Sequence, residues 1–127
     1  MKKLLLTLVL TVMCSSVVYA AKGEASLYVE HCKAAINFSG KYTPNATEAM
    51  NIGFCFGLMD GLRGGNHFLK KVDREAAFCE PSTFDKSDLA KAFVLVVNKN
   101  PQLKELRGAL AAQIALIQAF PCEKDNK

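Results

Sequence analysis

The chain has 127 residues, of which 16 are Lys or Arg and 12 are Asp or Glu. Removing the first twenty residues leaves 107, and subtracting Lys2 and Lys3 leaves 14 basic against 12 acidic residues, a net charge of +2. This length predicts one domain with a modest core. The near balance of charge argues against a nucleic-acid partner, which requires a clustered basic face.

Residues 1–20 have the features of a secretory signal peptide. A positive start at Lys2 and Lys3 is followed by an apolar run over residues 4–14, which is too short to span a bilayer. Residues 18–20 form a small-residue cleavage site, so we expect cleavage near Ala20 and export to the periplasm. Residues 21–127 then form a single domain without a membrane segment. An uncut anchor and a lipoprotein are the two alternatives.

The first helix is predicted from Ala25 to Ser39, because its apolar residues fall near one face. That face carries Leu27, His31, Cys32, Ala35, Ile36 and Phe38. A turn follows over residues 39–44. Asn45, with Glu48 three residues later, resembles a capping box and predicts a second helix from Ala46 to Arg63, ended by Gly64-Gly65.

The second helix is distinguished by glycines at Gly53, Gly57 and Gly61, which fall on one face at a spacing of four. Glycine in a helix interior costs roughly 1 kcal/mol relative to alanine. Three glycines in register therefore predict a groove where another helix lies close. A glycine-rich surface loop is the alternative, and the large apolar residues between the glycines favour the helix. We expect Asp60 to pair with Arg63 at a spacing of three.

Residues 66–78 allow either a short helix or an irregular excursion. Residues 79–81 are predicted to be extended, because a residue before proline avoids the helical region. Asp85 then predicts the N-cap of a third helix that ends near Asn98. The apolar run at 93–97 could also form a buried strand, but the chain offers no second strand to pair with it.

Pro101 predicts the first position of a fourth helix, since proline is favoured there. Its expected apolar stripe follows helical spacing, and residues 120–122 end the helix. The stripe comprises Leu103, Leu106, Leu110, Ile114 and Ile117.

Four cysteines remain after the signal peptide, an even count that predicts two disulfides in an exported chain. Antiparallel helices joined by a short turn bring together residues equidistant from that turn. The sequence midpoint of Cys32 and Cys55 falls between Thr43 and Pro44. The midpoint of Cys79 and Cys122 falls between Asn100 and Pro101. Of the three connectivities, Cys32–Cys55 with Cys79–Cys122 is favoured, each bond contributing roughly 3–4 kcal/mol. The predicted fold is all-α, a small bundle of about four helices in two disulfide-linked helical hairpins.

The sequence offers no arrangement of residues typical of an enzyme. The cysteines are better used as disulfides than as a nucleophile, and His31 and His67 lie in different segments. With two histidines and no C-x-x-C pair, neither a metal site nor another cofactor is expected.

Residues 53–61, Gly-Phe-Cys-Phe-Gly-Leu-Met-Asp-Gly, resemble the G-x-C-x-G-Y-x-x-G motif of the Rap/Tai immunity proteins. Residues 78–81 (Phe-Cys-Glu-Pro), 100–101 (Asn-Pro) and 119–122 (Ala-Phe-Pro-Cys) are similar to further marks of that family. Leu58 stands where an aromatic residue is usual. The similarity extends from Cys32 to Cys122 and implies scaffold roles for the matching glycines and prolines, which are Gly53, Gly57, Gly61, Pro81, Pro101 and Pro121.

The resemblance implies a small helical periplasmic protein, often a homodimer, that binds and blocks a peptidoglycan amidase delivered by type VI secretion. The alternative is a periplasmic stress or chaperone-like protein that uses apolar surface around Phe54, Phe56 and Phe68. An enzyme is the third and least favoured class.

The segment 64–77 is the candidate partner-binding segment, because it mixes basic and apolar side chains between fixed ends. We expect Phe68 to be the anchor, with His67, Lys70 and Arg74 around it. The alternative is a solvated connector whose apolar residues cover the core.

Overall fold

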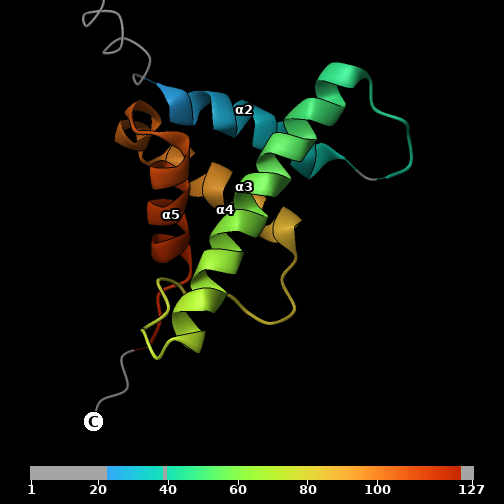
Figure 1. The fold of residues 1–127 in the computed structure, drawn as a ribbon. Coiled ribbons are helices and arrows are strands. Elements are labelled where there is room, and N and C mark those ends of the chain that lie inside the picture. The colour runs from blue at the N-terminus through green and yellow to red at the C-terminus, as the bar shows by residue number, and fades with distance from the viewer. Residues whose placement is uncertain (1–22, 39, 124–127) are drawn as a thin grey trace, which may run out of the picture.

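The computed structural model describes residues 23–38 and 40–123, whose helices pack around one core (Figure 1). The elements are α2 (Glu24–Asn37), α3 (Ala46–Lys71), α4 (Lys86–Lys99), the 3₁₀ helix η2 (Pro101–Glu105) and α5 (Gly108–Ala119). No strand occurs within the described ranges, which confirms the predicted all-α fold. The predicted signal peptide, residue 39 of the predicted turn and residues 124–127 lie outside them.

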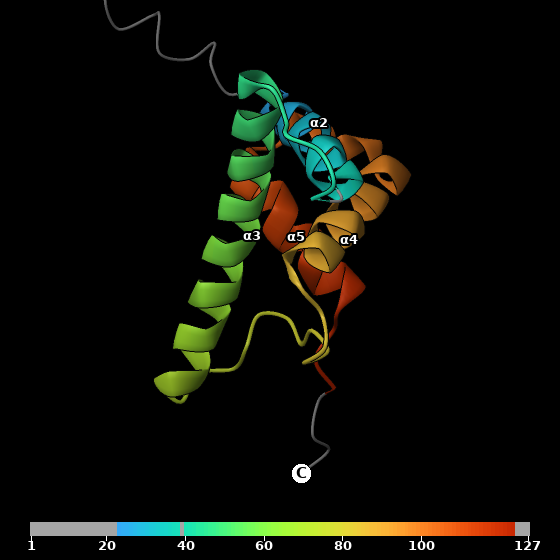
Figure 2. The ribbon, with the colours of Figure 1, turned by 90° about the vertical axis from the view of Figure 1, so that its right-hand side faces the viewer.

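Helix α2 packs against α3, α4 and α5, and α3 lies along one side of the molecule (Figure 2). The C-terminal half of α3 continues past α2, and the chain returns beside it in a loop that leads to α4 (Figure 2). The largest fully buried side chains include Phe78, Phe93, Met59, Leu89 and Leu116.

Both predicted disulfides are confirmed. Cys32–Cys55 joins α2 to α3, and Cys79–Cys122 joins the loop before α4 to the chain after α5, each with Cα atoms 4.9 Å apart. The Cys79 amide also donates to the Phe120 carbonyl oxygen at 2.8 Å. The two ends of the second half of the chain are therefore held together by a covalent bond and a hydrogen bond.

The predicted starts of α3 and α4 are confirmed as capping boxes. The Asn45 side chain accepts from the Glu48 amide at 2.9 Å, and the Glu48 carboxylate accepts from the Asn45 amide at 3.0 Å. Asp85 and Asp88 form the same reciprocal arrangement at α4. Residues 93–97 lie within α4, so the strand alternative for them is excluded.

The predicted end of the second helix is wrong. Helix α3 runs through Gly64-Gly65 and ends at Lys71, two turns beyond the prediction. Two consecutive glycines disfavour a helix by about 2 kcal/mol in total. Side chains on this last part of α3 make tertiary contacts that offset this cost, as described below.

The predicted fourth helix is divided, although Pro101 does open η2 and α5 does end before Pro121. Leu106 is extended, and its carbonyl oxygen accepts from the Ala25 amide at 3.0 Å, which satisfies a donor at the start of α2. The predicted stripe is confirmed in part: Leu103 is buried and Leu106 and Ile114 pack against the core, but Leu110 and Ile117 are exposed. The buried face of α5 consists instead of Gly108, Ala111, Ala112, Ala115 and Leu116.

Small residues let α5 approach α2 closely. A Cβ atom added to Gly108 would overlap the ring of Tyr28. Gly108 is therefore the glycine in the described chain whose missing side chain makes room for a neighbour. The glycines of α3 differ, because nothing in the described chain lies within 4 Å of a Cβ atom built on Gly53, Gly57 or Gly61. The predicted close contact at these glycines is not made within one chain.

Candidate protein-binding site

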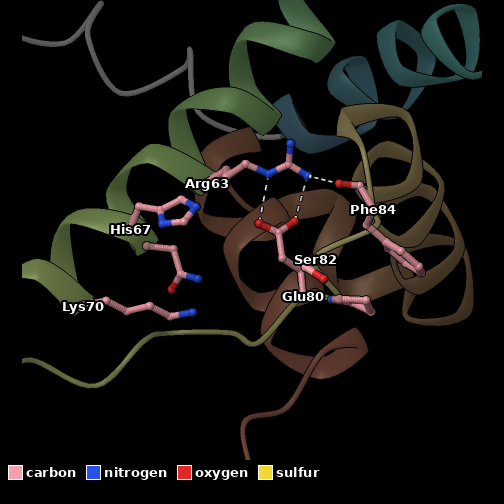
Figure 3. Close-up of a pocket in the computed structure, with 8 residues that line it drawn as sticks. Arg63, His67, Lys70, Glu80, Ser82 and Phe84 are labelled. Carbon is pink, nitrogen blue, oxygen red and sulfur yellow. Dashed lines mark hydrogen bonds and ion pairs between the residues drawn. The ribbon is translucent and has the colours of Figure 1, made fainter.

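A cavity of about 390 Å³ opens between the C-terminal half of α3 and the loop before α4, and we call it the α3 pocket. Helix α3 lines it with Arg63, Asn66, His67 and Lys70. Figure 3 shows Arg63, His67 and Lys70 following one another along the helix. The loop lines it with Glu80, Pro81, Ser82 and Phe84.

Arg63 joins the two walls of the pocket. Its Nε and Nη2 atoms each donate to one Glu80 carboxylate oxygen at 2.9 Å, and Nη2 also donates to the Phe84 carbonyl oxygen at 3.0 Å (Figure 3). The hydrogen bond to Glu80 is the main cause that raises the pKa of Arg63 above its ordinary value. The two side chains are 24% and 14% exposed, so this bidentate pair is worth more than a surface pair, about 2 kcal/mol.

Asn66 fixes the loop from beneath. Its side chain is buried, and Nδ2 donates to the Phe78 carbonyl oxygen at 2.7 Å. Its Oδ1 accepts from the amides of Ala77 at 2.7 Å and Phe78 at 3.3 Å. These bonds satisfy backbone groups that have no helix or strand partner. Asn66 makes these bonds from within α3, so they stabilise the continuation of the helix past Gly65.

Three polar groups at the pocket have no partner of their own. The side chains of His67, Lys70 and Ser82 make no hydrogen bond or ion pair with any residue in the described ranges. His67 and Lys70 reach from α3 toward the loop wall (Figure 3). The pocket therefore combines a fixed ion pair with unpaired donors.

A second surface lies on the solvent side of α3, and we call it the α3 outer face. It consists of Met50, Gly53, Phe54, Gly57, Gly61, Gly64 and Phe68, all exposed. The three large side chains are 55%, 50% and 63% exposed. Phe54 stacks by one side on His31 of α2, with ring centroids 5.5 Å apart, and its outer side faces solvent. None of these residues is charged, and at the centre of the surface the glycines have no side chains that project from the helix.

The structure divides the four predicted partner-binding residues among three places. His67 and Lys70 line the α3 pocket, and Phe68 lies on the outer face, about 200° around the helix from Lys70. Arg74 is exposed on the loop after α3. The predicted segment therefore does not form one continuous patch.

Two further predictions about side chains are wrong. Asp60 pairs with Lys86 at 3.5 Å, not with Arg63, whose guanidinium is engaged by Glu80. Phe56, expected on an exposed apolar surface, is half-buried against the core, and Lys86 Nζ lies 5.0 Å from its ring centroid.

The described residues hold no group of three or more side chains suited to bind a metal ion. None of their helices is both long and apolar enough to cross a membrane. All four cysteines in this part of the chain form disulfides, so none of them is available there as a thiolate nucleophile.

The described residues form a helical bundle that is linked by two disulfides and carries a pocket beside an exposed helix face. The chain matches the family model of the Rap1a immunity proteins over residues 24–122, and it belongs to that family. This range extends from the first residue of α2 to the last cysteine, which confirms the predicted Rap/Tai relationship. No curated protein matches the chain, and no solved structure matches it.

Proposed function

We propose that the mature domain is a periplasmic immunity protein that binds and occludes a peptidoglycan amidase delivered by type VI secretion. The observation that carries this proposal is the family match over residues 24–122, which covers the whole bundle. Inhibition of this kind requires binding alone, so we propose that the protein acts without catalysis.

The C-terminal half of α3 is the best support for a partner-binding role. It carries the α3 pocket on one side and Phe68 of the outer face on another. The Arg63–Glu80 pair, the hydrogen bonds of Asn66 and the Cys79–Cys122 bond hold this region in one arrangement. A rigid surface loses little entropy on binding, which favours affinity.

The proposal is tested with purified mature protein and a peptidoglycan amidase effector, sought first among the neighbouring genes. We expect peptidoglycan hydrolysis to stop near a one-to-one ratio of the two chains. A reduced and alkylated sample, in which the disulfides are broken, is the control and should not inhibit. Full amidase activity in the presence of excess folded protein would contradict the proposal.

A chaperone-like role is the second candidate, because Met50, Phe54 and Phe68 are exposed on α3. Large exposed apolar patches mark binding surfaces. Such a protein would suppress the aggregation of unrelated unfolded chains, for which reduced insulin is a suitable probe. Suppression of insulin aggregation without inhibition of the amidase would favour this candidate. The half-burial of Phe56 removes one of the three aromatic residues predicted for this surface.

We also propose that the outer face joins two copies of the chain. Its residues are arranged almost symmetrically about Met59: Gly57 mirrors Gly61, Phe54 mirrors Gly64, and Met50 mirrors Phe68. In an antiparallel pair of α3 helices related by a two-fold axis that crosses the outer face between Gly57 and Gly61, each Phe54 would face a glycine of the other copy. Antiparallel pairing also opposes the two helix dipoles.

The predicted dimer is weak. A helix of 26 residues is about 39 Å long, and a strip about 10 Å wide along it buries roughly 400 Å² per copy. Specific stable interfaces bury about 800 Å² per partner. We therefore expect dimers only at micromolar or higher concentrations, measured by sedimentation velocity. Gly57→Leu should abolish the dimers, whereas Ala109→Leu, at an exposed position of α5, should not. A chain that stays monomeric at all concentrations would contradict the pairing.

A further inference from the structure

The charges at the α3 pocket do not balance. Arg63 and Glu80 neutralise each other through their bidentate pair. The Lys70 ammonium makes no ion pair with any acidic side chain in the described residues. The pocket therefore presents one unpaired positive charge, with the His67 ring and the Ser82 hydroxyl as further unpaired donors.

The walls of the pocket restrict the kind of anion that fits. Because Glu80 is paired with Arg63, Lys70 supplies the one uncompensated charge of the lining, which matches a monoanion better than a dianion such as phosphate. Pro81 contributes apolar surface beside the donors. A carboxylate at the end of a short apolar stem matches this combination, because the stem can pack on the proline ring while the oxygens meet the donors.

The size and place of the cavity favour a protein side chain over a free metabolite. A volume of about 390 Å³ is near the lower end for small-molecule sites, and the cavity is open to the surface beside the exposed end of α3. A protein that docks on this end of α3 would bring its own side chains to the opening.

We propose that the α3 pocket receives an Asp or Glu side chain of the inhibited amidase, with Lys70 as its ionic partner and His67 and Ser82 as hydrogen-bond donors. This inference rests on the proposed function, because it names the chemistry of the same partner. The Arg63–Glu80 pair acts as a positioning element that keeps the loop wall in place and leaves Lys70 as the free cation.

The first experiment measures inhibition of the amidase by two matched variants, Lys70→Gln and Lys71→Gln. Both remove one positive charge from the same turn of α3, but Lys71 does not line the pocket. We expect Lys70→Gln to raise the inhibition constant at least tenfold and Lys71→Gln to change it less than twofold. We also expect the salt dependence of binding to weaken only for Lys70→Gln. Equal inhibition by the two variants would overturn the inference while leaving the proposed function intact.

The second experiment tests the pocket without the amidase, by amide NMR of the labelled mature protein. N-acetylaspartate methylamide is the probe, and N-acetylasparagine methylamide and inorganic phosphate at matched ionic strength are the controls. We expect saturable shifts at residues 67, 70 and 82 with the aspartate probe only, and their loss in Lys70→Gln. Equal shifts with asparagine or phosphate, or no shifts, would overturn the carboxylate assignment. If the wild type fails to inhibit the amidase, the proposed function fails, and this experiment decides the pocket's chemistry alone.

Discussion

The same substitution, glycine to alanine, should change the free energy of unfolding in opposite directions at Gly57 and at Gly108. Nothing lies within 4 Å of a Cβ atom at Gly57, in the middle of α3, so alanine adds no clash and gains helix propensity. We expect Gly57→Ala to stabilise the monomer by about 1 kcal/mol. At Gly108 the added atom would overlap the Tyr28 ring, and overpacking costs about 1–3 kcal/mol. The two variants should therefore differ by about 2–4 kcal/mol.

The measurement is urea unfolding of the oxidised protein followed by circular dichroism, at concentrations too low for dimers. For a domain of this size, 1 kcal/mol corresponds to a change in melting temperature of several degrees. Equal m-values would show that the folded and unfolded states keep their compactness. Destabilisation by Gly57→Ala would mean that a segment of the chain covers the outer face, which would refute the open surface. An unchanged Gly108→Ala would refute the close contact between α5 and Tyr28.

Three further variants test the contacts that hold the loop and α4. Asn66→Ala should lower the free energy of unfolding, measured in urea, by about 3 kcal/mol, because three hydrogen bonds to buried or half-buried backbone groups are removed. Asn98→Ala, at an exposed position of α4, should change it little. Glu80→Gln should lower the free energy of unfolding by about 2 kcal/mol. Most of this effect should disappear in a variant that lacks the Arg63 guanidinium, and Glu75→Gln on the exposed loop is the control. The amide of the N-cap residue lowers the pKa of Asp88 below its ordinary value of 3.8, so its contribution to stability is present above that value and is lost as the pH falls through the lowered pKa. Asp88→Asn should accordingly lower the melting temperature at pH 6 and have progressively less effect on acidification, and an effect independent of pH would contradict this assignment.

The features predictable from sequence were those with local or geometric causes. The capping box at Asn45 and the N-cap at Asp85 depend on residues within one turn of each other, and both are present. The disulfide pairing followed from the symmetry of cysteines about two turns. In contrast, the end of α3 depends on Asn66, whose partners lie eleven and twelve residues later in a segment without periodicity. Helix propensity at Gly64-Gly65 could not anticipate this.

The candidate site was predictable only in part, for a related reason. His67 and Lys70 stood out as basic residues in an exposed segment, and they line one pocket. The opposite wall comes from Glu80, seventeen residues from its partner Arg63, so no spacing rule relates them. Leucine and isoleucine periodicity does not identify the buried face of α5, since Leu110 and Ile117 are exposed. Helix α5 is buried through alanines instead, which carry little weight in such a pattern.

The glycines of α3 are better explained by a surface role than by the fold. Five of them, at positions 53, 57, 61, 64 and 65, are exposed and have open space around them. Together they disfavour the helix by about 4–5 kcal/mol relative to alanine, which is a large share of a typical domain's 5–15 kcal/mol. The Cys32–Cys55 bond fixes the first half of α3 to α2, and Arg63 with Asn66 fixes the second half to the loop. These tertiary contacts stabilise a helix that its own sequence disfavours. The resulting helix has an uncharged outer face on which the glycines leave room for another chain. Packing inside the monomer gives no reason for such a side, whereas close approach by another helix does.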